Sequence, residues 1–350
     1  MQDAQHDAFW QKQETAQVMA RLQSCPEAYR RFLALSDELK EELIGFCEGN
    51  RGLKISYDPF FKMIFDPESH KERLSDLLSS LLGIRVNVRR ALPVEGGRLS
   101  AVSSLLIMDL LAELEDGRFV NLEMQKVGYL FPGERAACYS SDLLLRQYSR
   151  VKATQRENFS YRDLKEVYTI ALVEHSGPEF KRHPDCYLHR SAQHFSSGLD
   201  LNMLQEFIFV PLDIFLDNFA KKGNNISGEL EAWLLFLSSD KLSDILRIID
   251  AYPWFRDIYR ELFELQNRPE ELVNMFSEAL EVMDRNTVKL MIEMQKQELE
   301  AQTLELKAQT QELERVQKTL AEQTQRFEEQ RRAQEAEIAR LKALLAQKSV

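Results

Sequence analysis

Apolar and polar residues alternate most strictly in the middle of the chain, in two segments near residues 106–114 and 118–127. The even positions of both segments are apolar: Met108, Leu110, Ala112, Leu114, Val120, Leu122 and Met124. A period of two predicts two strands, each with one apolar face. Asp116-Gly117 lies between them and is a strong turn signal, so the pattern predicts a β-hairpin.

The length of the turn decides which residues of the hairpin face each other. A two-residue loop at 116–117 would set every even residue opposite an odd one and mix the two faces. A three-residue loop at 115–117 pairs Leu114 with Arg118 and aligns the apolar faces. Gly117 then takes the left-handed position of a type I turn with a bulge, which favours glycine.

The same register sets Asp109 opposite Glu123, with Gln125 two residues further on the same face. Two opposed carboxylates repel each other by up to ~1 kcal/mol at an exposed pair. A divalent cation between them would reverse that sign, because hard cations take carboxylate and amide oxygens. The pattern therefore indicates a metal site, and the alternative is a solvated polar face of an edge hairpin.

The remaining chain predicts helices on either side of further strands. Short helices are expected in residues 1–50, with Ser36 as a helix cap and Gly49 at an exit. A helix should begin near 57 with Asp58 as cap and Pro59 at its first position, and a second should end at Gly83. Further elements are expected as strands at 84–92, 164–175 and 206–215, and as helices at 133–153 and 228–283. Pro211 suggests that the last strand ends there or lies at an edge. This order predicts an α/β core with helices on both faces.

The tail from about 288 to 346 contains no proline or glycine and repeats an apolar residue every seven positions. The repeat is Ile292, Leu299, Leu306, Leu313, Leu320, Phe327 and, after a break, Leu341. This period predicts a coiled coil that oligomerises the chain, and a solitary charged helix is the alternative.

The composition of the 350 residues indicates the class of protein, its compartment and its possible partners. Hydrophobic residues make up 44 %, no run approaches a membrane span, and the first residues lack a secretory signal. Four scattered cysteines favour a reducing compartment, so a soluble cytoplasmic protein is expected. The net charge of −11 argues against a nucleic-acid partner, yet residues 51–190 carry 21 Lys or Arg against 19 Asp or Glu. The acidity therefore lies outside the segment with the candidate chemistry.

Three stretches, DPFFKMIF, MDLLAELEDGRFVNLEMQ and GERAACYSSDLLLRQY, resemble the PD-(D/E)XK nuclease family transposases, also called recombination-promoting nucleases. The resemblance covers about 55–215. It implies a central mixed sheet of four strands flanked by helices and a Mg²⁺-dependent (or Mn²⁺-dependent) DNA endonuclease. The resulting division is a helical extension at 1–50, a nuclease-like domain at 51–215, a helical region at 216–283 and a coiled-coil tail at 284–350.

The resemblance also implies roles for individual residues. Asp109 and Glu123 match the metal-binding acids, and Gln125 stands where most PD-(D/E)XK enzymes have lysine. The backbone carbonyl of Met124 is a further candidate ligand. On the following helix, Arg135 and Tyr139 match an R-x3-Y motif. Arg146 and Arg150 continue the same polar stripe, so all four are candidate DNA contacts, and a solvated helix face is the alternative.

Other readings stay open beside this one. His183, Cys186, His189 and His194 could bind zinc. Asp58 could supply a third acid, and Lys152 could replace the missing lysine, whereas Lys126 should point to the opposite face. The competing function is an inactive nuclease fold that serves as a DNA-binding or scaffold protein.

Overall fold

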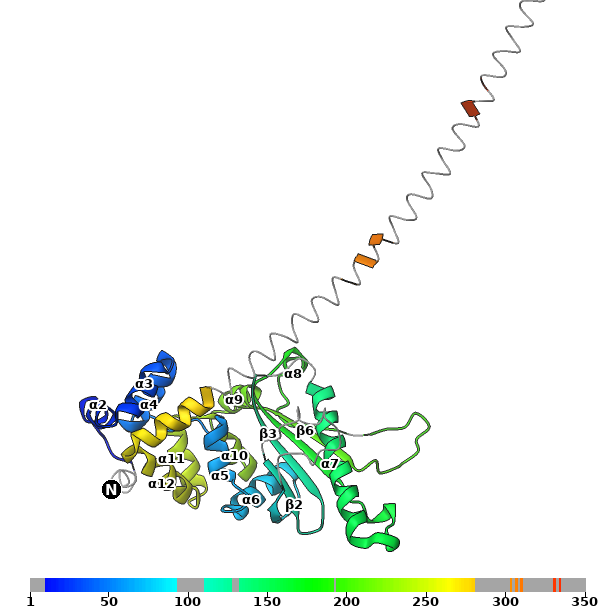
Figure 1. Cartoon of the computed structure of the whole chain (residues 1–350), viewed down its shortest axis with the longest axis horizontal. Helices are drawn as coiled ribbons and strands as arrows, with labels where there is room; N and C mark the ends of the chain where they lie inside the picture. The colour runs from blue at the N-terminus through cyan, green and yellow to red at the C-terminus, as the bar shows by residue number, and fades with distance from the viewer. Residues whose placement is uncertain are drawn as a thin grey trace, which may run out of the picture. The chain divides into compact units, whose positions relative to one another are not determined.

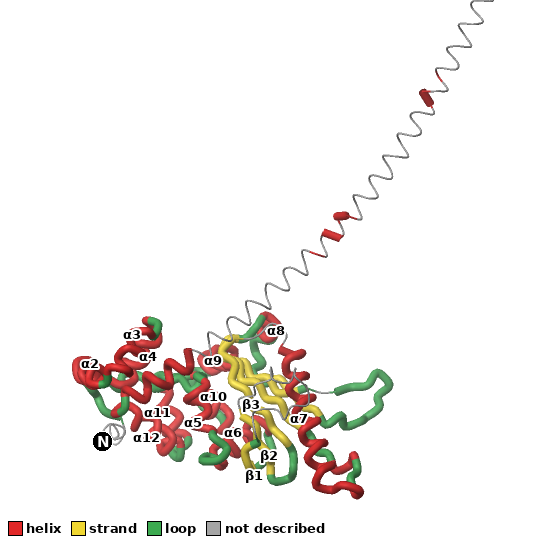
Figure 2. The backbone as a smooth tube through the Cα atoms, in the orientation of Figure 1, coloured by secondary structure: helices red, strands yellow, loops and turns green. Residues whose placement is uncertain are grey.

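The structure, a computed structural model, describes residues 10–92, 110–127, 132–191 and 193–280, with eight separate positions of the tail. The chain divides into two compact units, Met1–Thr287 and Val288–Val350. In the first unit, a mixed sheet has helices on both faces (Figures 1 and 2). The expected α/β class is therefore confirmed.

The described part of the chain begins with three short helices: α2 (Thr15–Ser24), α3 (Pro26–Ala34) and α4 (Asp37–Cys47). The Ser36 hydroxyl accepts a hydrogen bond from the Leu39 backbone N–H at 3.3 Å and so caps α4. Gly49, at its exit, has a φ of +69°. Both details confirm the sequence prediction.

Helices α5 (Asp58–Phe65) and α6 (Lys71–Leu82) follow. Helix α6 ends at Gly83 in the left-handed conformation, as predicted. The predicted cap of α5 is wrong by one residue. Tyr57 occupies the cap position, Asp58 is the first helical residue, and its carboxylate accepts a hydrogen bond from Lys62 at 2.9 Å.

The sheet has six strands within the described residues, in the order β1-β2-β3-β4-β6-β5. Their bounds are β1 (Val88–Ala91), β2 (Leu110–Leu114), β3 (Phe119–Val127), β4 (Val167–His175), β5 (His189–Arg190) and β6 (Gln205–Pro211). The pairs β3–β4 and β4–β6 are parallel, and the other pairs are antiparallel. The sheet is mixed, as expected, but it exceeds the four expected strands because two short strands, β1 and β5, extend its edges.

Helix α7 (Pro132–Gln155) connects the parallel strands β3 and β4 and covers one face of the sheet (Figure 1). Two short 3₁₀ turns, η2 (Arg156–Asn158) and η3 (Tyr161–Asp163), complete this connection. The helix predicted at 133–153 is thus confirmed. A parallel pair needs such a crossover because a tight turn cannot return the chain to the same end.

After β4, a short helix α8 (Pro178–Lys181) precedes the edge strand β5. Strand β6 ends at Pro211, and α9 (Leu212–Lys221) begins at the next residue. The prediction that Pro211 ends the strand is confirmed. The edge alternative is wrong, because β6 pairs with β4 on one side and β5 on the other.

The last described part of the first unit is helical, as predicted for 228–283. It comprises α10 (Glu229–Ser238), α11 (Leu242–Ala251), α12 (Phe255–Glu264), the turn η4 (Leu265–Asn267) and helical residues 269–280. Rings from these helices pack against earlier elements, with Phe276 contacting both Tyr57 and Phe60.

The first unit contains one large apolar core and one small one. The large core joins buried residues from α2 to the helix at 269–280, including Leu22, Phe46, Leu122 and Trp233. The small core lies on the other sheet face, under α7, and consists of Leu111, Phe119, Tyr139, Leu143 and Val167. Both faces of the hairpin are therefore covered.

The predicted coiled coil lies mostly outside the described residues. The eight described positions of the tail are helical: 303, 306, 307, 309, 310, 330, 331 and 334. Leu306, one of the heptad positions, is 64 % exposed. No helix among the described residues has both the length and the apolar character that a membrane crossing requires. All four cysteines are free thiols.

Candidate functional site

The β2–β3 hairpin has the register that packing of its apolar faces predicts. Leu110 pairs with Leu122 and Ala112 with Val120. The Leu114 backbone N–H donates to the Arg118 carbonyl at 2.8 Å, and Gly117 has a φ of +90°. The three-residue loop at 115–117 and the left-handed glycine are both confirmed.

The polar face of this hairpin is buried beneath α7. Asn121 is fully buried, and Glu123 and Gln125 are only 2 % and 8 % exposed. The Asn121 side-chain amide donates a hydrogen bond to Glu123 Oε1 at 3.0 Å. The alternative of a solvated polar face is therefore wrong for Glu123 and Gln125, and the hairpin is not an edge because β1 covers β2.

Asp109 lies outside the described residues, as does the rest of the segment 93–109. The pairing of Asp109 with Glu123 stays a prediction for that reason. Its premise, the register of the neighbouring pairs from Leu110 to Glu113, is the one observed. Within the described part of the chain, no three His, Cys, Asp or Glu side chains gather as metal ligands.

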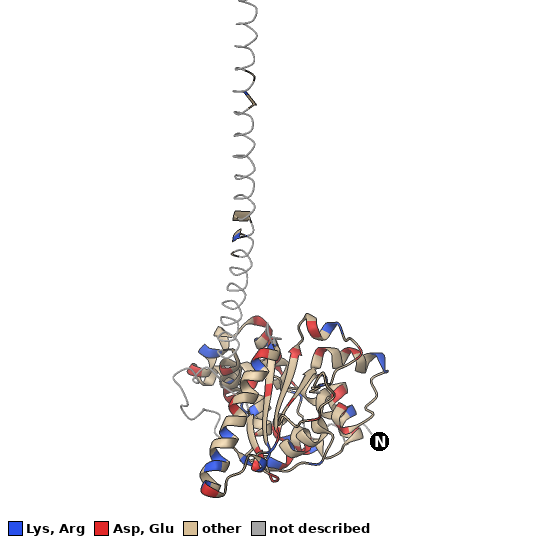
Figure 3. Cartoon of the chain, turned by 90° about the vertical axis from the view of Figure 1, so that its right-hand side faces the viewer, with Lys and Arg blue, Asp and Glu red and all other residues tan. Residues whose placement is uncertain are grey.

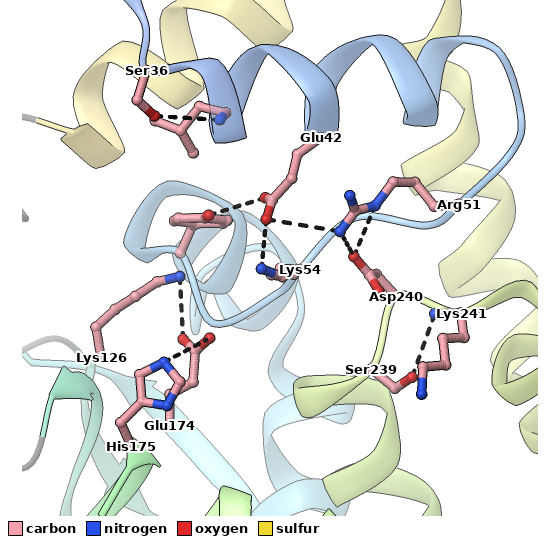
Figure 4. Close-up of polar contacts among 12 residues, drawn as sticks. Ser36, Glu42, Arg51, Lys54, Lys126, Glu174, His175, Ser239, Asp240 and Lys241 are labelled. Atoms are coloured by element: carbon pink, nitrogen blue, oxygen red, sulfur yellow. Dashed lines mark hydrogen bonds and ion pairs between the residues drawn. The ribbon is translucent and has the colours of Figure 1, made fainter.

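Strand β3 also positions the residues on either side of Gln125. Met124 pairs with Leu172 of β4, and its side chain packs against the large core. Only its backbone is therefore left for the proposed ligand role. Lys126 points away from Gln125, as predicted, and contacts Tyr57 and Glu174 on the opposite face (Figure 4).

The surroundings of Lys126 explain why it cannot replace the missing lysine. Its Nζ lies 3.1 Å from a Glu174 carboxylate oxygen and 3.2 Å from the centre of the Tyr57 ring. Burial lowers the pKa of Lys126, and the nearby Glu174 opposes that shift. Figure 4 shows it joined to Glu174, with the ion pair between Glu42 and Lys54 nearby.

Helix α7 carries the four candidate DNA-contacting residues in two kinds of surroundings. Tyr139 is buried in the small core, and the Arg135 guanidinium lies 5.2 Å from the centre of its ring. Arg146 donates from Nε to Asp142 at 2.7 Å, and Arg150 forms an ion pair with Glu113. The alternative of a wholly solvated stripe is therefore wrong at Tyr139.

Lys152 does not reach the hairpin. Its Nζ donates to the Tyr148 hydroxyl at 2.9 Å, and its side chain is exposed at the far end of α7. The suggestion that it replaces the missing lysine is wrong for this structure, because its exposed amino group is directed to Tyr148.

Glu113, which the sequence pattern does not single out, lies on the same sheet face and is 5 % exposed. The guanidinium groups of Arg89, Arg90 and Arg150 all lie in ion-pair contact with it. A bulge between Val88 and Arg90 brings two consecutive arginines of β1 to this carboxylate. Its odd position and the Arg89-Arg90 pair were the available signals.

The alternative zinc site is not formed. The His183 and His189 rings lie 5.9 Å apart, and His189 also packs against Phe180 at 5.5 Å. Burial lowers the pKa of His189, and neighbouring His183 adds to that shift. Among the described residues, which include Cys186 and His194, no three-ligand group is present.

Comparison with known proteins places this chain in one family. A family model described as PD-(D/E)XK nuclease family transposase matches residues 56–291, about two thirds of the chain. The match continues beyond 215 through α10, α11 and α12. No curated protein and no solved structure matches significantly. The chain therefore belongs to the PD-(D/E)XK nuclease family transposases, and its function is nuclease-like.

Proposed function

We propose that this protein is a Mg²⁺-dependent (or Mn²⁺-dependent) endonuclease that hydrolyses phosphodiester bonds in DNA, of the recombination-promoting type. The carrying observation is the burial of the Glu123 carboxylate on the polar face of the hairpin. A buried charge is costly unless it is paired, hydrogen-bonded or bound to a metal ion. Glu123 accepts a hydrogen bond from Asn121, and a bound divalent cation would stabilise its buried charge further.

The oxygen atoms around Glu123 fit a hard divalent cation. Asn121 donates its amide N–H to Glu123, while its Oδ1 is buried and has no hydrogen-bond partner within the described residues. The Gln125 side chain, which carries another amide oxygen, is buried on the same face. Carboxylate and amide oxygens are the ligands that Mg²⁺ and Mn²⁺ prefer.

Asp109 is the proposed second carboxylate. The observed pairing of Leu110 with Leu122 supports this assignment, because the proposal depends on the same register. Asp109 and Glu123 would then hold the cation together with the Met124 backbone carbonyl. A bound divalent cation activates the attacking water and neutralises charge on the phosphate.

Gln125 is proposed to orient the attacking water through its side-chain amide. It cannot act as a base, because an amide does not accept a proton near neutral pH. Helix α7 would hold the DNA backbone through Arg135, Arg146 and Arg150. The buried Tyr139 ring packs against the Arg135 guanidinium. The role of Tyr139 in DNA binding would therefore be to position Arg135.

Plasmid nicking tests this proposal against its main alternative. Supercoiled plasmid is incubated with Mg²⁺ and either the wild-type protein or Asp109→Ala. The nuclease proposal expects nicked circles with wild type and at least 100-fold slower nicking with Asp109→Ala, since a metal ligand is lost. The control variant Glu115→Gln, which changes an exposed carboxylate in the turn of the β2–β3 hairpin, should nick the plasmid at the normal rate.

The alternative is an inactive nuclease fold that binds DNA or serves as a scaffold. The observation that favours it is Gln125 in place of lysine, together with Lys126 directed to the opposite face. If neither wild type nor Asp109→Ala nicks the plasmid, although both are folded and bind DNA, the result would support the scaffold and contradict the enzyme.

The tail extends the proposal to an oligomer in the cytoplasm. The heptad repeat from Ile292 to Phe327 favours a coiled coil. A dimer would bring two single-strand-cutting sites together for a double-strand break. Light scattering on the full chain tests this, because a monomer that still makes double-strand breaks would contradict the dimer.

A further inference from the structure

The far end of α7 and the turns that follow it form a lobe beyond the sheet (Figure 1). We call residues 148–165 the α7 lobe. It contains the last two turns of α7, then η2 and η3, and it returns the chain to β4.

Three aromatic rings of the α7 lobe pack on one another. Tyr148 and Phe159 lie 5.4 Å apart, Phe159 and Tyr161 lie 5.3 Å apart, and both of these pairs meet edge to face. Tyr148 and Tyr161 are nearly parallel, with an interplanar angle of 17° and centres 6.1 Å apart. The outermost ring, Tyr161, nevertheless remains 73 % exposed.

Positive charge surrounds these rings although the whole chain is acidic. The α7 lobe carries five Lys or Arg residues against two Asp or Glu, whereas the chain has a net charge of −11. Lys152 lies against Tyr148, with its Nζ 5.3 Å from the ring centre. Figure 3 shows Lys and Arg along α7, with Asp or Glu also present at its end.

Three further cations of the α7 lobe are exposed: Arg156, Arg162 and Lys165. Within the described residues, none of them forms an ion pair. Of the two acids, Asp163 accepts a hydrogen bond from the Ser160 backbone N–H in a capping box. Lys165 lies near the Asp116 carboxylate, whose pKa it helps to lower, whereas Arg156 and Arg162 have no ion pair within the described residues. The lobe thus carries a net positive charge.

A purely structural role explains only part of this arrangement. Packing of the three rings can hold the turn against α7, and the partly buried Tyr148 and Phe159 are suited to this anchoring role. An anchoring role does not require Tyr161 to leave most of its ring in solvent. An exposed aromatic ring among cations is the arrangement by which proteins stack an unpaired base and hold its phosphates.

We propose that the α7 lobe binds a single-stranded segment of DNA, with Tyr161 stacking on an unpaired base and Arg156, Arg162 and Lys165 holding the flanking phosphates. Duplex DNA is the poorer occupant, because its bases are already stacked inside the helix and do not offer a free face. The inference rests on the proposed function for the identity of its ligand, DNA.

The position of the lobe fits a role in selecting DNA structure. Tyr148 lies nine residues after Tyr139, roughly 14 Å further along the same helix at 1.5 Å per residue. A strand held by the lobe would continue along α7 past Arg146 toward the hairpin. The substrate implied is DNA with an unpaired segment next to the cut, such as a frayed end or a branched intermediate.

Fluorescence anisotropy of the full chain tests the proposal separately from cleavage. Two labelled probes are used, both in EDTA. One is a single-stranded DNA of about 20 nucleotides, which is long enough for common site sizes, and the other is the duplex of the same sequence. Tyr161→Ala should weaken binding of the single strand about 5- to 150-fold, the value of one stacked base. Binding of the duplex should change less than about twofold.

Matched variants keep the interpretation clear. Tyr161→Phe retains the ring and should bind the single strand nearly as wild type does. Leu145→Ala removes another exposed apolar side chain of α7 (52 % exposed) and should have no effect. Arg162→Gln should lower the slope of log affinity against log salt by about 0.7 for the single strand, as expected for one lost phosphate contact.

Unchanged binding of the single strand by Tyr161→Ala would overturn the proposal, and so would an equal loss for both probes. Because the probes are measured without metal, plasmid nicking reports independently on the nuclease. If the protein never nicks DNA but needs Tyr161 to bind the single strand, the nuclease proposal fails and the proposed binding by the α7 lobe stands. If nicking depends on Asp109 but Tyr161→Ala binds the single strand normally, the nuclease proposal stands and the proposed binding by the α7 lobe fails.

Discussion

The polar sheet face under α7 holds two buried carboxylates with different partners. Glu113 is surrounded by three guanidinium groups, from Arg89, Arg90 and Arg150. Glu123 accepts a hydrogen bond from the neutral amide of Asn121. The three guanidinium groups neutralise Glu113, so we assign it to stability. Glu123 is the proposed metal ligand, buried on the face that also carries Asn121 Oδ1, an atom without a hydrogen-bond partner among the described residues.

Glu113→Gln should therefore destabilise the fold. The substitution leaves three arginines together without their shared anion, and removal of one partner of a buried ion pair costs about 3–5 kcal/mol. These arginine side chains are 60 %, 47 % and 33 % exposed, so solvent screening reduces the expected loss to about 1–2 kcal/mol. Urea unfolding measures it, and Glu115→Gln is the control. An unchanged midpoint would show that the cluster adds no stability.

The four free cysteines should react at different rates. Cys47 lies in the large core, and its burial raises the pKa of its thiol to about 12. Cys138 and Cys186 are exposed. A coloured thiol reagent at pH 8 should therefore label Cys138 and Cys186 first and Cys47 only after unfolding. Rapid labelling of Cys47 in the native protein would contradict the packing of α4.

At the scale of elements, the hairpin depends on the turn at Gly117, whose φ is +90°. A side chain there meets only an ordinary contact, with Lys165 Cγ 3.9 Å from the added Cβ. The cost of Gly117→Ala is thus conformational, about 1–2 kcal/mol for a left-handed alanine. Thermal unfolding should show this loss, whereas Gly133→Ala, in the first turn of α7, should be neutral or stabilising. Equal behaviour of the two variants would contradict the turn geometry.

The hairpin also shows which features the sequence could predict. Its register followed from local rules, because the apolar even positions must share a face and Gly117 suits only one turn. The burial of the odd face was not predictable in that way. It depends on α7, which arrives later in the chain and is held by Gln147, whose side-chain amide donates to the Gly117 carbonyl at 3.2 Å. The partners of Glu113 and the burial of Tyr139 follow from this long-range packing.

At the scale of the whole chain, the N-terminal helices share the large core with segments far away in the sequence. Trp10 and Phe46 both pack on Phe263 of α12, at 5.4 and 5.3 Å between ring centres. The Glu42 carboxylate of α4 contacts Lys54 and Tyr57, and Arg51 contacts Asp240 (Figure 4). Residues 10–50 thus complete the core beneath the family segment.

Removal of residues 1–50 should accordingly unfold the first unit or lower its melting temperature by roughly 10 °C or more, because several large buried side chains are lost. Removal of 288–350 should leave that melting temperature nearly unchanged, since these residues form a separate unit. Circular dichroism of both shortened chains measures the difference. A chain that starts at 51 and melts like the full protein would contradict the shared core.

Glu123 is proposed to hold the metal ion on which DNA cleavage would depend. The most direct measurement is the rate of plasmid nicking at saturating Mg²⁺ by wild type, Glu123→Gln and Glu113→Gln, each confirmed as folded. We expect no nicking in EDTA, a loss of at least about 100-fold for Glu123→Gln since the ligand charge is removed, and near-normal nicking by Glu113→Gln. Nicking by Glu123→Gln at the wild-type rate would contradict the claim.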